Sequence, residues 1–365
     1  MSGPAGDADR LGAEVAARAA RAAGAHGPVG LLLDVSLPSR VDGAAALAAA
    51  AQDAGLAGGW VPETTADPFP AATAALLATS TLTVGTAVAV AFARSPFVLA
   101  QASWELARFS GGRFVLGLGT QVKAHSERRF AVPWERPAAR LREYVLALRA
   151  IWAAFQGEAP LEFTGEFYRH TLLTPIFDPG PIEHPRVPVL LAAVNPAVAA
   201  LGGEVADGLV GHPLTSRHYL TEVVAPALGR GLELAGRSRS EVRLLNPVWV
   251  VSGGTDAERS AGREAVRRQI AVYGSTRTYR AVFEAHGWGD LPDRLHPLMA
   301  AGETDRMAEL VSDEMVGTFA VDAPPAEVAG RVRERFAGLV DRTMLYQPVP
   351  PSLAAPGALP WPAGS

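Results

Sequence analysis

The feature that most constrains this chain is a regular alternation of short apolar runs with longer amphipathic segments between Pro28 and Pro348. Several of the runs are apolar at nearly every position, which is typical of strands covered on both faces. The eight runs are Val29–Ser36, Gly59–Pro62, Leu82–Val90, Arg113–Gly119, Val187–Val194, Asp207–Gly211, Arg243–Ser252 and Arg342–Gln347. Strands that alternate with helices form parallel sheets, so the pattern predicts an α/β fold, a (β/α)₈ barrel over residues 28–348.

The segments between the runs indicate one clear outer helix and two insertions. Apolar residues recur every three or four positions over Glu135–Phe155, as in a helix packed on the outside of a barrel. Residues 157–186 are rich in proline and aromatic residues, so we expect an irregular insertion in which a hairpin would fit. A second insertion, about 255–316, is predicted to be helical. Insertions after strands commonly shape substrate pockets.

Composition narrows the range of partners. The formal net charge is -4, with 33 basic and 37 acidic residues well mixed, which gives no basic stripe for a nucleic acid. The chain contains no cysteine, so no disulfide, thiolate nucleophile or cysteine-ligated metal is proposed, and we predict no metal site. We expect a small-molecule substrate instead.

The chain ends and the hydropathy pattern bear on location. No stretch approaches the roughly 18 apolar residues of a membrane span. Residues 1–27 lack the unbroken apolar core of a signal peptide and are predicted to be a flexible or helical extension. Residues 349–365 are rich in proline and are predicted to be a disordered tail. These features predict a soluble, cytoplasmic protein.

Three ionisable side chains follow or end predicted strands, where barrel enzymes place their functional groups. Asp34 and Glu63 are candidates for catalysis or ligand contact, with the holding of a neighbouring loop as an equally weighted alternative. His212, directly followed by Pro213, is a candidate catalytic base, and a structural histidine is the alternative interpretation.

The segment Ser110–Gln121 ends a predicted strand in closely spaced glycines. Glycine at such a position lets a flat ligand or its phosphate approach the backbone, and a tight turn at the barrel rim is the alternative. The residue three beyond Gly119 is Val122 and no helix opens on the glycines, so this is not the dinucleotide fingerprint. A doubly wound nicotinamide dehydrogenase is therefore disfavoured.

A second candidate ligand site closes the fifth predicted strand. Ala193, Val194 and Asn195 precede a predicted helix with Pro196 near its first turn. Free N–H groups at such a helix start bind anions. An ordinary asparagine cap without a ligand is the other interpretation.

Five segments together resemble the bacterial luciferase-like superfamily in order and spacing. They are Gly85–Val88, Arg94–Pro96, Ser110–Arg113, Leu116–Gln121 and Gly203–Gly208. The following run Gln121–His125, with Arg128–Phe130, Pro133–Trp134 and Arg136–Pro137, is similar to a branch of deazaflavin-dependent oxidoreductases. The resemblance covers most of Leu31–Tyr346 and implies a luciferase-like TIM barrel that pairs as a homodimer.

The resemblance also implies a cofactor site at the strand ends. A non-proline cis peptide would lie between Ala87 and Val88, and the phosphate loop would match Ala193, Val194 and Asn195. The cofactor-binding residues expected on all grounds are Thr86, Ala87, Val88, Gly119, Thr120, Gln121, Ala193, Val194 and Asn195.

The implied activity is hydride transfer between a deazaflavin, coenzyme F-420, and a small organic substrate. The chain departs from the sugar-phosphate dehydrogenase branch, which places a histidine directly after the first-strand aspartate, because that position is Val35 here. That branch's proton relay and substrate are not carried over, and luciferase's light reaction is not supported. The alternatives are an FMN-dependent monooxygenase on the same fold and a non-catalytic flavin-binding barrel.

Overall fold

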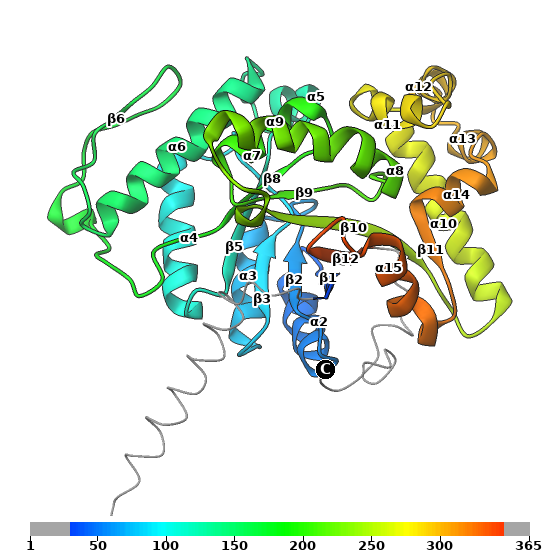
Figure 1. Ribbon diagram of the computed structural model, residues 1–365, viewed down its shortest axis with the longest axis horizontal. Helices are drawn as coiled ribbons and strands as arrows, with labels where there is room; N and C mark the ends of the chain where they lie inside the picture. The colour runs from blue at the N-terminus through cyan, green and yellow to red at the C-terminus, as the bar shows by residue number, and fades with distance from the viewer. Residues whose placement is uncertain (1–29, 347–365) are drawn as a thin grey trace, which may run out of the picture.

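A computed structural model describes residues 30–346, and within them eight parallel strands close into a barrel. The strands are β1 (Leu32–Ser36), β2 (Gly58–Val61), β3 (Thr83–Thr86), β5 (Phe114–Gly119), β8 (Val189–Ala192), β9 (Gly208–Val210), β10 (Arg243–Val251) and β12 (Arg342–Tyr346). They pair in this order around the ring, and β12 pairs with β1 to close it (Figure 1). The predicted barrel is confirmed.

Helices connect successive strands and surround the ring. Those before β10 are α2 (Val41–Asp53), α3 (Pro68–Leu77), α4 (Pro96–Ser110), α5 (Lys123–Arg128), α6 (Pro137–Phe155), α7 (Pro196–Val205), α8 (Arg217–Tyr219), the π-helical turn η2 (Leu220–Val224), α9 (Ala225–Ala235) and the 3₁₀ turn η3 (Arg239–Glu241). Helix α6 buries Leu141, Val145, Leu148 and Trp152, as the spacing predicted. It begins two residues after Glu135, because Pro137 occupies its first turn.

Apart from small shifts at the strand ends, the strands differ from the prediction in two respects. The predicted run Leu82–Val90 is interrupted, with β3 ending at Thr86 and the short strand β4 (Ala89–Val90) pairing with β5. A short strand outside the ring, β11 (Ala320–Asp322), pairs with the far end of β10 and was not predicted, because three residues carry little pattern. The predicted extension 1–27 and tail 349–365 lie outside the described residues.

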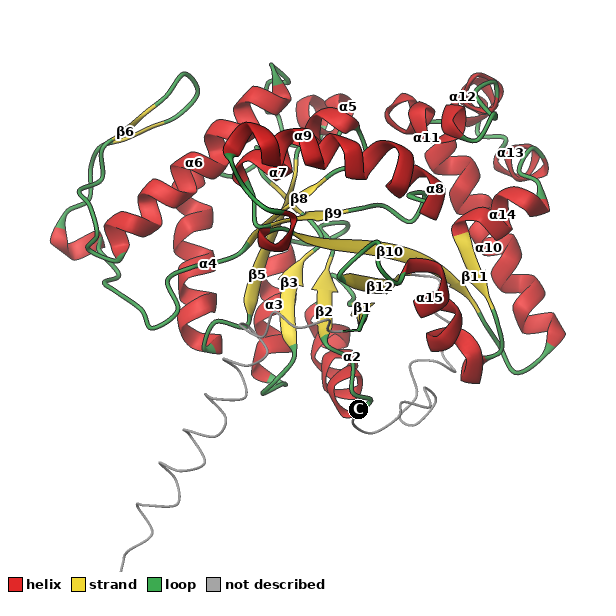
Figure 2. Ribbon diagram, in the orientation of Figure 1, coloured by secondary structure: helices red, strands yellow, loops and turns green. Residues whose placement is uncertain are grey.

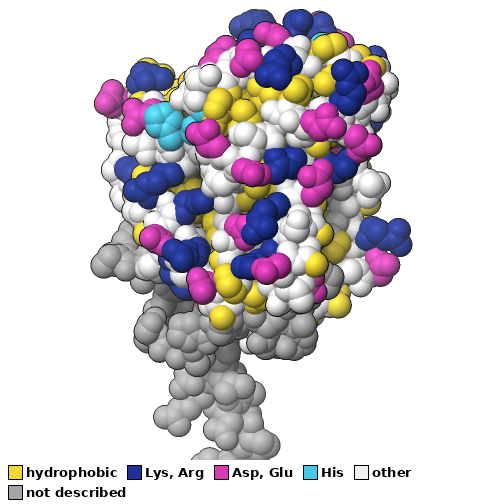
Figure 3. Space-filling view, turned by 90° about the vertical axis from the view of Figure 1, so that its right-hand side faces the viewer, with side chains coloured by type: hydrophobic (Ala, Val, Ile, Leu, Met, Phe, Trp, Pro, Cys, Tyr) yellow, Lys and Arg dark blue, Asp and Glu magenta, His cyan; other side chains and the backbone are white. Residues whose placement is uncertain are grey.

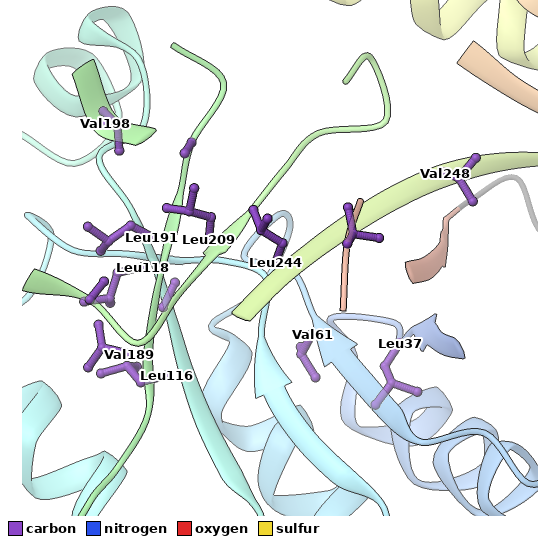
Figure 4. Close-up of a cluster of buried hydrophobic side chains, with 14 of the residues drawn as sticks. Leu37, Val61, Leu116, Leu118, Val189, Leu191, Val198, Leu209, Leu244 and Val248 are labelled. Atoms are coloured by element: carbon purple, nitrogen blue, oxygen red, sulfur yellow. The ribbon is translucent and has the colours of Figure 1, made fainter. Parts of the chain in front are cut away.

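Two hydrophobic layers hold the barrel together. Inside the ring, Trp60 packs with five aliphatic side chains, namely Val115, Leu190, Val210, Leu245 and Met344. Alternate residues of the same strands point outward and pack against the helices. Figure 4 shows part of this outer layer, including Leu116, Leu118 and Val189. The alternation explains why the strands are apolar at nearly every position.

The irregular insertion lies between α6 and β8 (Figure 2). It contains a short antiparallel hairpin, β6 (Phe163–Thr164) with β7 (Arg169–His170), and the 3₁₀ turn η1 (Pro175–Phe177). Glu143 of α6 accepts hydrogen bonds from the backbone N–H groups of Glu166, Phe167 and Tyr168, which fixes the hairpin on that helix.

The second insertion is helical and follows β10. It comprises α10 (Asp256–Gly274), the 3₁₀ turn η4 (Arg277–Tyr279), α11 (Arg280–Ala285), α12 (Leu291–Ala301), α13 (Thr304–Glu309) and α14 (Asp313–Phe319). After β11, the 3₁₀ turn η5 (Pro325–Glu327) and α15 (Val328–Phe336) lead into β12. On the face of the molecule drawn in Figure 3, acidic and basic side chains intermingle.

Ion pairs join the helices of this second insertion to one another. Arg267 and Arg268 of α10 pair with Asp313 and Asp305, respectively. None of the helices within residues 30–346 has the length and apolar character needed to cross a membrane.

Candidate active site

The mouth of the barrel, at the carboxyl ends of its strands, is shaped by a bulge between β3 and β4. The bulge consists of Ala87 and Val88, and their peptide bond is cis, which confirms what the family resemblance implied. Thr86 is fully buried; its hydroxyl donates to the Gly117 carbonyl oxygen at 2.7 Å and accepts from the Gly117 N–H at 3.0 Å. The Thr86 side chain therefore joins β3 to β5, and its contact with a cofactor stays a prediction.

The two glycines of β5 accommodate this bulge. A Cβ on Gly117 would lie 1.9 Å from the Thr86 carbonyl oxygen, and a Cβ on Gly119 would lie 2.6 Å from Val88 Cγ2. The sequence suggested that these glycines admit a ligand, but the neighbouring strand already requires them. Together Ala87, Val88, Gly119 and Ala192 form a patch of small side chains at the mouth, called here the small-residue cradle.

Thr120 and Gln121 continue β5 beyond the cradle. Gln121 has a φ of 63°, in the left-handed region, so the chain turns sharply here before α5. The Thr120 hydroxyl donates to the Gln121 carbonyl oxygen at 3.1 Å, and Gln121 Oε1 accepts from the Val122 N–H at 3.3 Å. Both residues are partly exposed at the rim, where the sequence placed them.

The predicted phosphate loop lies at the start of α7. Ala193 is buried, whereas Asn195 is exposed, and Asn195 Oδ1 accepts from the Val198 N–H at 2.9 Å. Asn195 is thus the N-cap of α7, with Pro196 in the first turn. The carbonyl oxygen of Val194 accepts from the Tyr219 hydroxyl at 3.0 Å, so this loop is anchored to the next helical segment. The cap interpretation is confirmed, and a ligand at this helix start stays a prediction.

Glu63 follows β2 and holds the segment just beyond the cradle. One of its oxygens accepts from the Val90 N–H at 2.7 Å, and both accept from the Arg94 guanidinium, at 2.8 and 3.0 Å. Arg94 also pairs with Asp67. Burial acts to lower the pKa of Arg94, but the two carboxylates outweigh it and raise that pKa above its ordinary value. Glu63 therefore anchors β4, as the loop-holding interpretation expects, and a part in catalysis stays a prediction.

Asp34 lies inside the barrel, below the mouth. It is fully buried and accepts two hydrogen bonds from Arg342, each 2.7 Å long, and one from Trp60 Nε1 at 2.7 Å. Asp34 is the middle residue of β1 and pairs in register with Gly58 of β2 and Met344 of β12. It forms an ion pair in the interior, and a part in catalysis stays a prediction.

His212 follows β9 and lies among aromatic rings. Its ring centroid is 4.4 Å from that of Tyr273, 4.6 Å from that of Tyr279 and 6.3 Å from that of Trp249. Burial lowers the pKa of His212 to about 3. At neutral pH this imidazole is uncharged, which favours the structural interpretation over that of a catalytic base. It remains a hydrogen-bonding group.

The structure adds three tyrosines that the sequence did not single out. Tyr273 lies in the last turn of α10, Tyr279 ends η4 and Tyr346 ends β12. Burial raises the pKa of Tyr346, and the neighbouring phenols of Tyr273 and Tyr279 raise it further. These three tyrosines, with His212 and Trp249, are called here the rim aromatic cluster.

The rim aromatic cluster adjoins the small-residue cradle. Tyr346, like Ala87 and Val88, packs against the interior hydrophobic cluster, so all three residues face the inside of the barrel. Tyr346 could have been found by counting alternate residues inward from Arg342. Tyr273 and Tyr279 could not, because they reach the mouth from the insertion. Within residues 30–346, no three histidine, aspartate or glutamate side chains are grouped so that they could hold a metal ion.

Comparisons with known proteins agree with this architecture. An uncharacterised protein of Mycobacterium tuberculosis is 49% identical over 314 residues, covering 86% of this chain and 92% of that protein. A 5,10-methylenetetrahydromethanopterin reductase of Archaeoglobus fulgidus is 28% identical over 310 residues, covering 82% and 88%. The solved structure of a coenzyme F-420-dependent tetrahydromethanopterin reductase from Methanopyrus kandleri has the same fold, with a TM-score of 0.74 at 21% identity over 89% of this chain and 96% of that one.

The family follows from the extent of these matches. The sequence profile described as luciferase-like monooxygenase matches residues 14–342, which is most of the chain. The barrel, the bulge and the long match to the Mycobacterium tuberculosis protein agree with that profile. This chain belongs to the luciferase-like monooxygenase family.

Proposed function

We propose that this chain is an oxidoreductase that uses a deazaflavin, coenzyme F-420, and transfers a hydride between that cofactor and a small organic substrate. The observation that carries the proposal is the small-residue cradle beside the rim aromatic cluster, at one mouth of a closed barrel. The reductase of similar fold from Methanopyrus kandleri, named as coenzyme F-420-dependent, supports the choice of cofactor. We expect the protein to act in the cytoplasm as a homodimer.

The residues at the mouth fit a flat redox ring. No side chain of the cradle is larger than valine, so a planar ring would meet a low apolar surface there. A Cβ on Gly119 would also approach Ala192 Cβ to 3.4 Å, so β5 and β8 are already in close contact beneath that surface. Because such a cofactor carries its own hydride, the protein mainly has to align the substrate and keep the pocket dry, and no metal is needed.

Each part of the chain then has a definite role. Ala87, Val88, Gly119 and Ala192 would support the ring, and Thr120 and Gln121 would flank it. The N–H groups at the start of α7 would face the phosphate-bearing tail. Glu63 and Arg94 hold the bulge in place through the Val90 N–H, and act through the cradle rather than on the substrate. The bound deazaflavin would supply the hydride-carrying carbon.

Binding of the cofactor is the direct test. Purified protein is titrated with coenzyme F-420 and with FMN while cofactor fluorescence is followed, and a dissociation constant in the micromolar range or lower is expected for the deazaflavin. Ala192→Phe fills the cradle and should weaken that binding at least tenfold. Ala138→Phe, at an exposed position of α6, is the matched control and should leave it unchanged. Binding of neither cofactor by the unmodified protein would exclude the proposal.

The same titration separates the alternatives. Preference for FMN, with oxygen consumed in the presence of an organic substrate, would identify a monooxygenase on the same fold. Carbon in place of nitrogen at the reactive ring position disfavours oxygen activation, so a deazaflavin enzyme should consume none. Tight cofactor binding without turnover of any carbonyl or alcohol would identify a non-catalytic flavin-binding barrel.

A further inference from the structure

In the rim aromatic cluster, the hydrogen bonds and the pKa shifts determine which side-chain atoms carry a proton. The Leu214 N–H donates to His212 Nδ1 at 3.2 Å, so the uncharged imidazole carries its proton on Nε2. Within residues 30–346, no hydrogen bond engages that Nε2 atom. The phenols of Tyr279 and Tyr346 are protonated at every physiological pH, because burial raises the pKa of each. The Tyr346 phenol also interacts with the Tyr273 phenol, so the cluster offers donors on His212 and Tyr279 and a third, on Tyr346, that is shared with Tyr273.

Among the residues that the structure describes, no charged side chain contributes to the pKa shifts of His212, Tyr279 or Tyr346. Burial alone lowers the pKa of His212, and burial together with the other phenols raises those of Tyr279 and Tyr346. A phosphate or carboxylate placed here would lose its hydration without gaining an ion pair. An uncharged oxygen would instead receive the hydrogen bonds that the cluster offers. The cluster thus favours a neutral ligand with an acceptor oxygen.

The rim aromatic cluster also lies beside the small-residue cradle, where the reacting part of a substrate would lie. Tyr346 and the bulge residues Ala87 and Val88 pack on the same interior cluster and face the inside of the barrel. His212 and Tyr346 follow β9 and β12, whereas the cradle belongs to β3, β5 and β8. These strands follow one another around the ring in the order β3, β5, β8, β9, β10 and β12. A flat apolar surface and a set of hydrogen-bond donors therefore meet at the same mouth.

We propose that His212, Tyr279 and Tyr346 hydrogen-bond the oxygen of an uncharged carbonyl substrate whose carbonyl carbon faces the small-residue cradle. This inference rests on the proposed function. A bound reduced deazaflavin would supply the hydride to the carbonyl carbon, and the π electron pair would move to oxygen. That oxygen takes the proton of the Tyr346 phenol, and solvent returns a proton to the phenolate. The substrate is reduced to an alcohol and the cofactor is oxidised.

Each donor has its own part in this step. The neutral imidazole of His212 polarises the carbonyl through its Nε2–H without taking on charge, a role that an imidazole of ordinary pKa performs less well. Tyr346, which faces the inside of the barrel, is the proton donor. Tyr279 completes the set and closes the mouth from the helical insertion.

Two matched aldehydes test the substrate class. Benzaldehyde and para-carboxybenzaldehyde share the reacting group and differ by one carboxylate. With the protein loaded with reduced coenzyme F-420, oxidation of the deazaflavin is followed by absorbance. We expect kcat/KM for benzaldehyde to exceed that for its carboxylate counterpart at least tenfold. Equal or reversed preference, or reduction of neither aldehyde, would overturn the inference.

Three variants test the residues. Tyr346→Phe should lower kcat by about a hundredfold or more, the usual effect of losing a general acid, while the dissociation constant of the cofactor stays within twofold. His212→Leu should raise KM, and His212→Gln, which keeps an N–H donor, should restore part of the loss. Tyr168→Phe, in the hairpin, is the control and should match the parent protein. Full activity of Tyr346→Phe would overturn the proton-donor assignment.

Failure of this inference is distinguishable from failure of the proposed function. If the unmodified protein binds neither deazaflavin nor FMN, the proposed function itself is excluded. If it binds the deazaflavin and reduces the charged aldehyde as well as the neutral one, only the substrate class assigned here is wrong.

Discussion

The carbonyl oxygen of Thr86 occupies the space that any side chain on Gly117 would need, since a Cβ at residue 117 would lie 1.9 Å from that oxygen. The two residues are also joined by both hydrogen bonds of the Thr86 hydroxyl. The bulge that forms one wall of the candidate site and the glycine of the next strand are therefore one structural unit.

We predict that Gly117→Ala destabilises the protein by about 1 to 3 kcal/mol, the usual cost of inserting a methyl group into a filled interior. The displaced bulge should also weaken cofactor binding. Gly330→Ala is the control, because a methyl group added at this position of α15 would have no neighbour within 4 Å, and alanine there should stabilise the helix slightly. Urea denaturation of both variants checks this, and an unchanged midpoint for Gly117→Ala would show that the bulge can shift freely.

The ion pair inside the barrel gives a second prediction. Asp34→Asn keeps the size of the side chain but leaves the Arg342 guanidinium without its counter-charge in a buried position. Breaking a buried pair in this way costs about 3 to 5 kcal/mol. Asp42→Asn removes the exposed pair with Arg40 and should leave the denaturation midpoint nearly unchanged. Equal denaturation midpoints for the two variants would mean that the interior pair contributes little.

The sequence predicts the barrel well because the relevant signal is local. Each strand covered on both faces leaves a continuous apolar run, and the eight runs appear in chain order. Asp34 shows the limit of this reasoning. Its position near the end of a run suggests the rim, but Ser36 is the last residue of β1, so the inward-facing Asp34 lies one level lower. Its partner Arg342 is 308 positions away, beyond any local pattern.

For similar reasons, the sequence predicted some parts of the candidate site and missed others. The cis peptide at Ala87 and Val88 was recognised through the family resemblance, not through the residues alone. Gly117 and Gly119 were identified as important, but their cause was a neighbouring strand rather than a ligand. Tyr273 and Tyr279 belong to an insertion whose direction depends on packing between helices, which short-range spacing does not encode.

Stability should depend on pH through His212. Folding lowers the pKa of this histidine from its ordinary 6.5 to about 3, so the unfolded chain binds a proton that the folded chain excludes. The contribution of the uncharged His212 to the free energy of unfolding is unaffected above pH 6.5 and is lost as the pH falls from there towards 3. Between pH 7 and pH 5 the loss should be about 2 kcal/mol.

His212→Gln should remove this part of the pH dependence, whereas His125→Gln, at an exposed position, should retain it. Denaturation in urea at the two pH values measures the difference for each variant. A pH dependence that is the same in the parent protein and in His212→Gln would show that the histidine is protonated in the folded state.

Two substitutions at the start of α7 distinguish the helix-capping role of Asn195 from a contact with the cofactor. Asn195→Asp and Asn195→Ser both keep a side-chain oxygen that can cap the Val198 N–H, so neither should unfold the helix. Only the aspartate sets a negative charge against the cofactor phosphate, and it should weaken cofactor binding by about 1 to 3 kcal/mol. Asn195→Ser should bind nearly as well as the parent protein, and raising the salt concentration should narrow the gap between the two variants. Fluorescence titration measures both affinities, and an unchanged affinity for Asn195→Asp would remove Asn195 from the cofactor site and leave it as a helix cap alone.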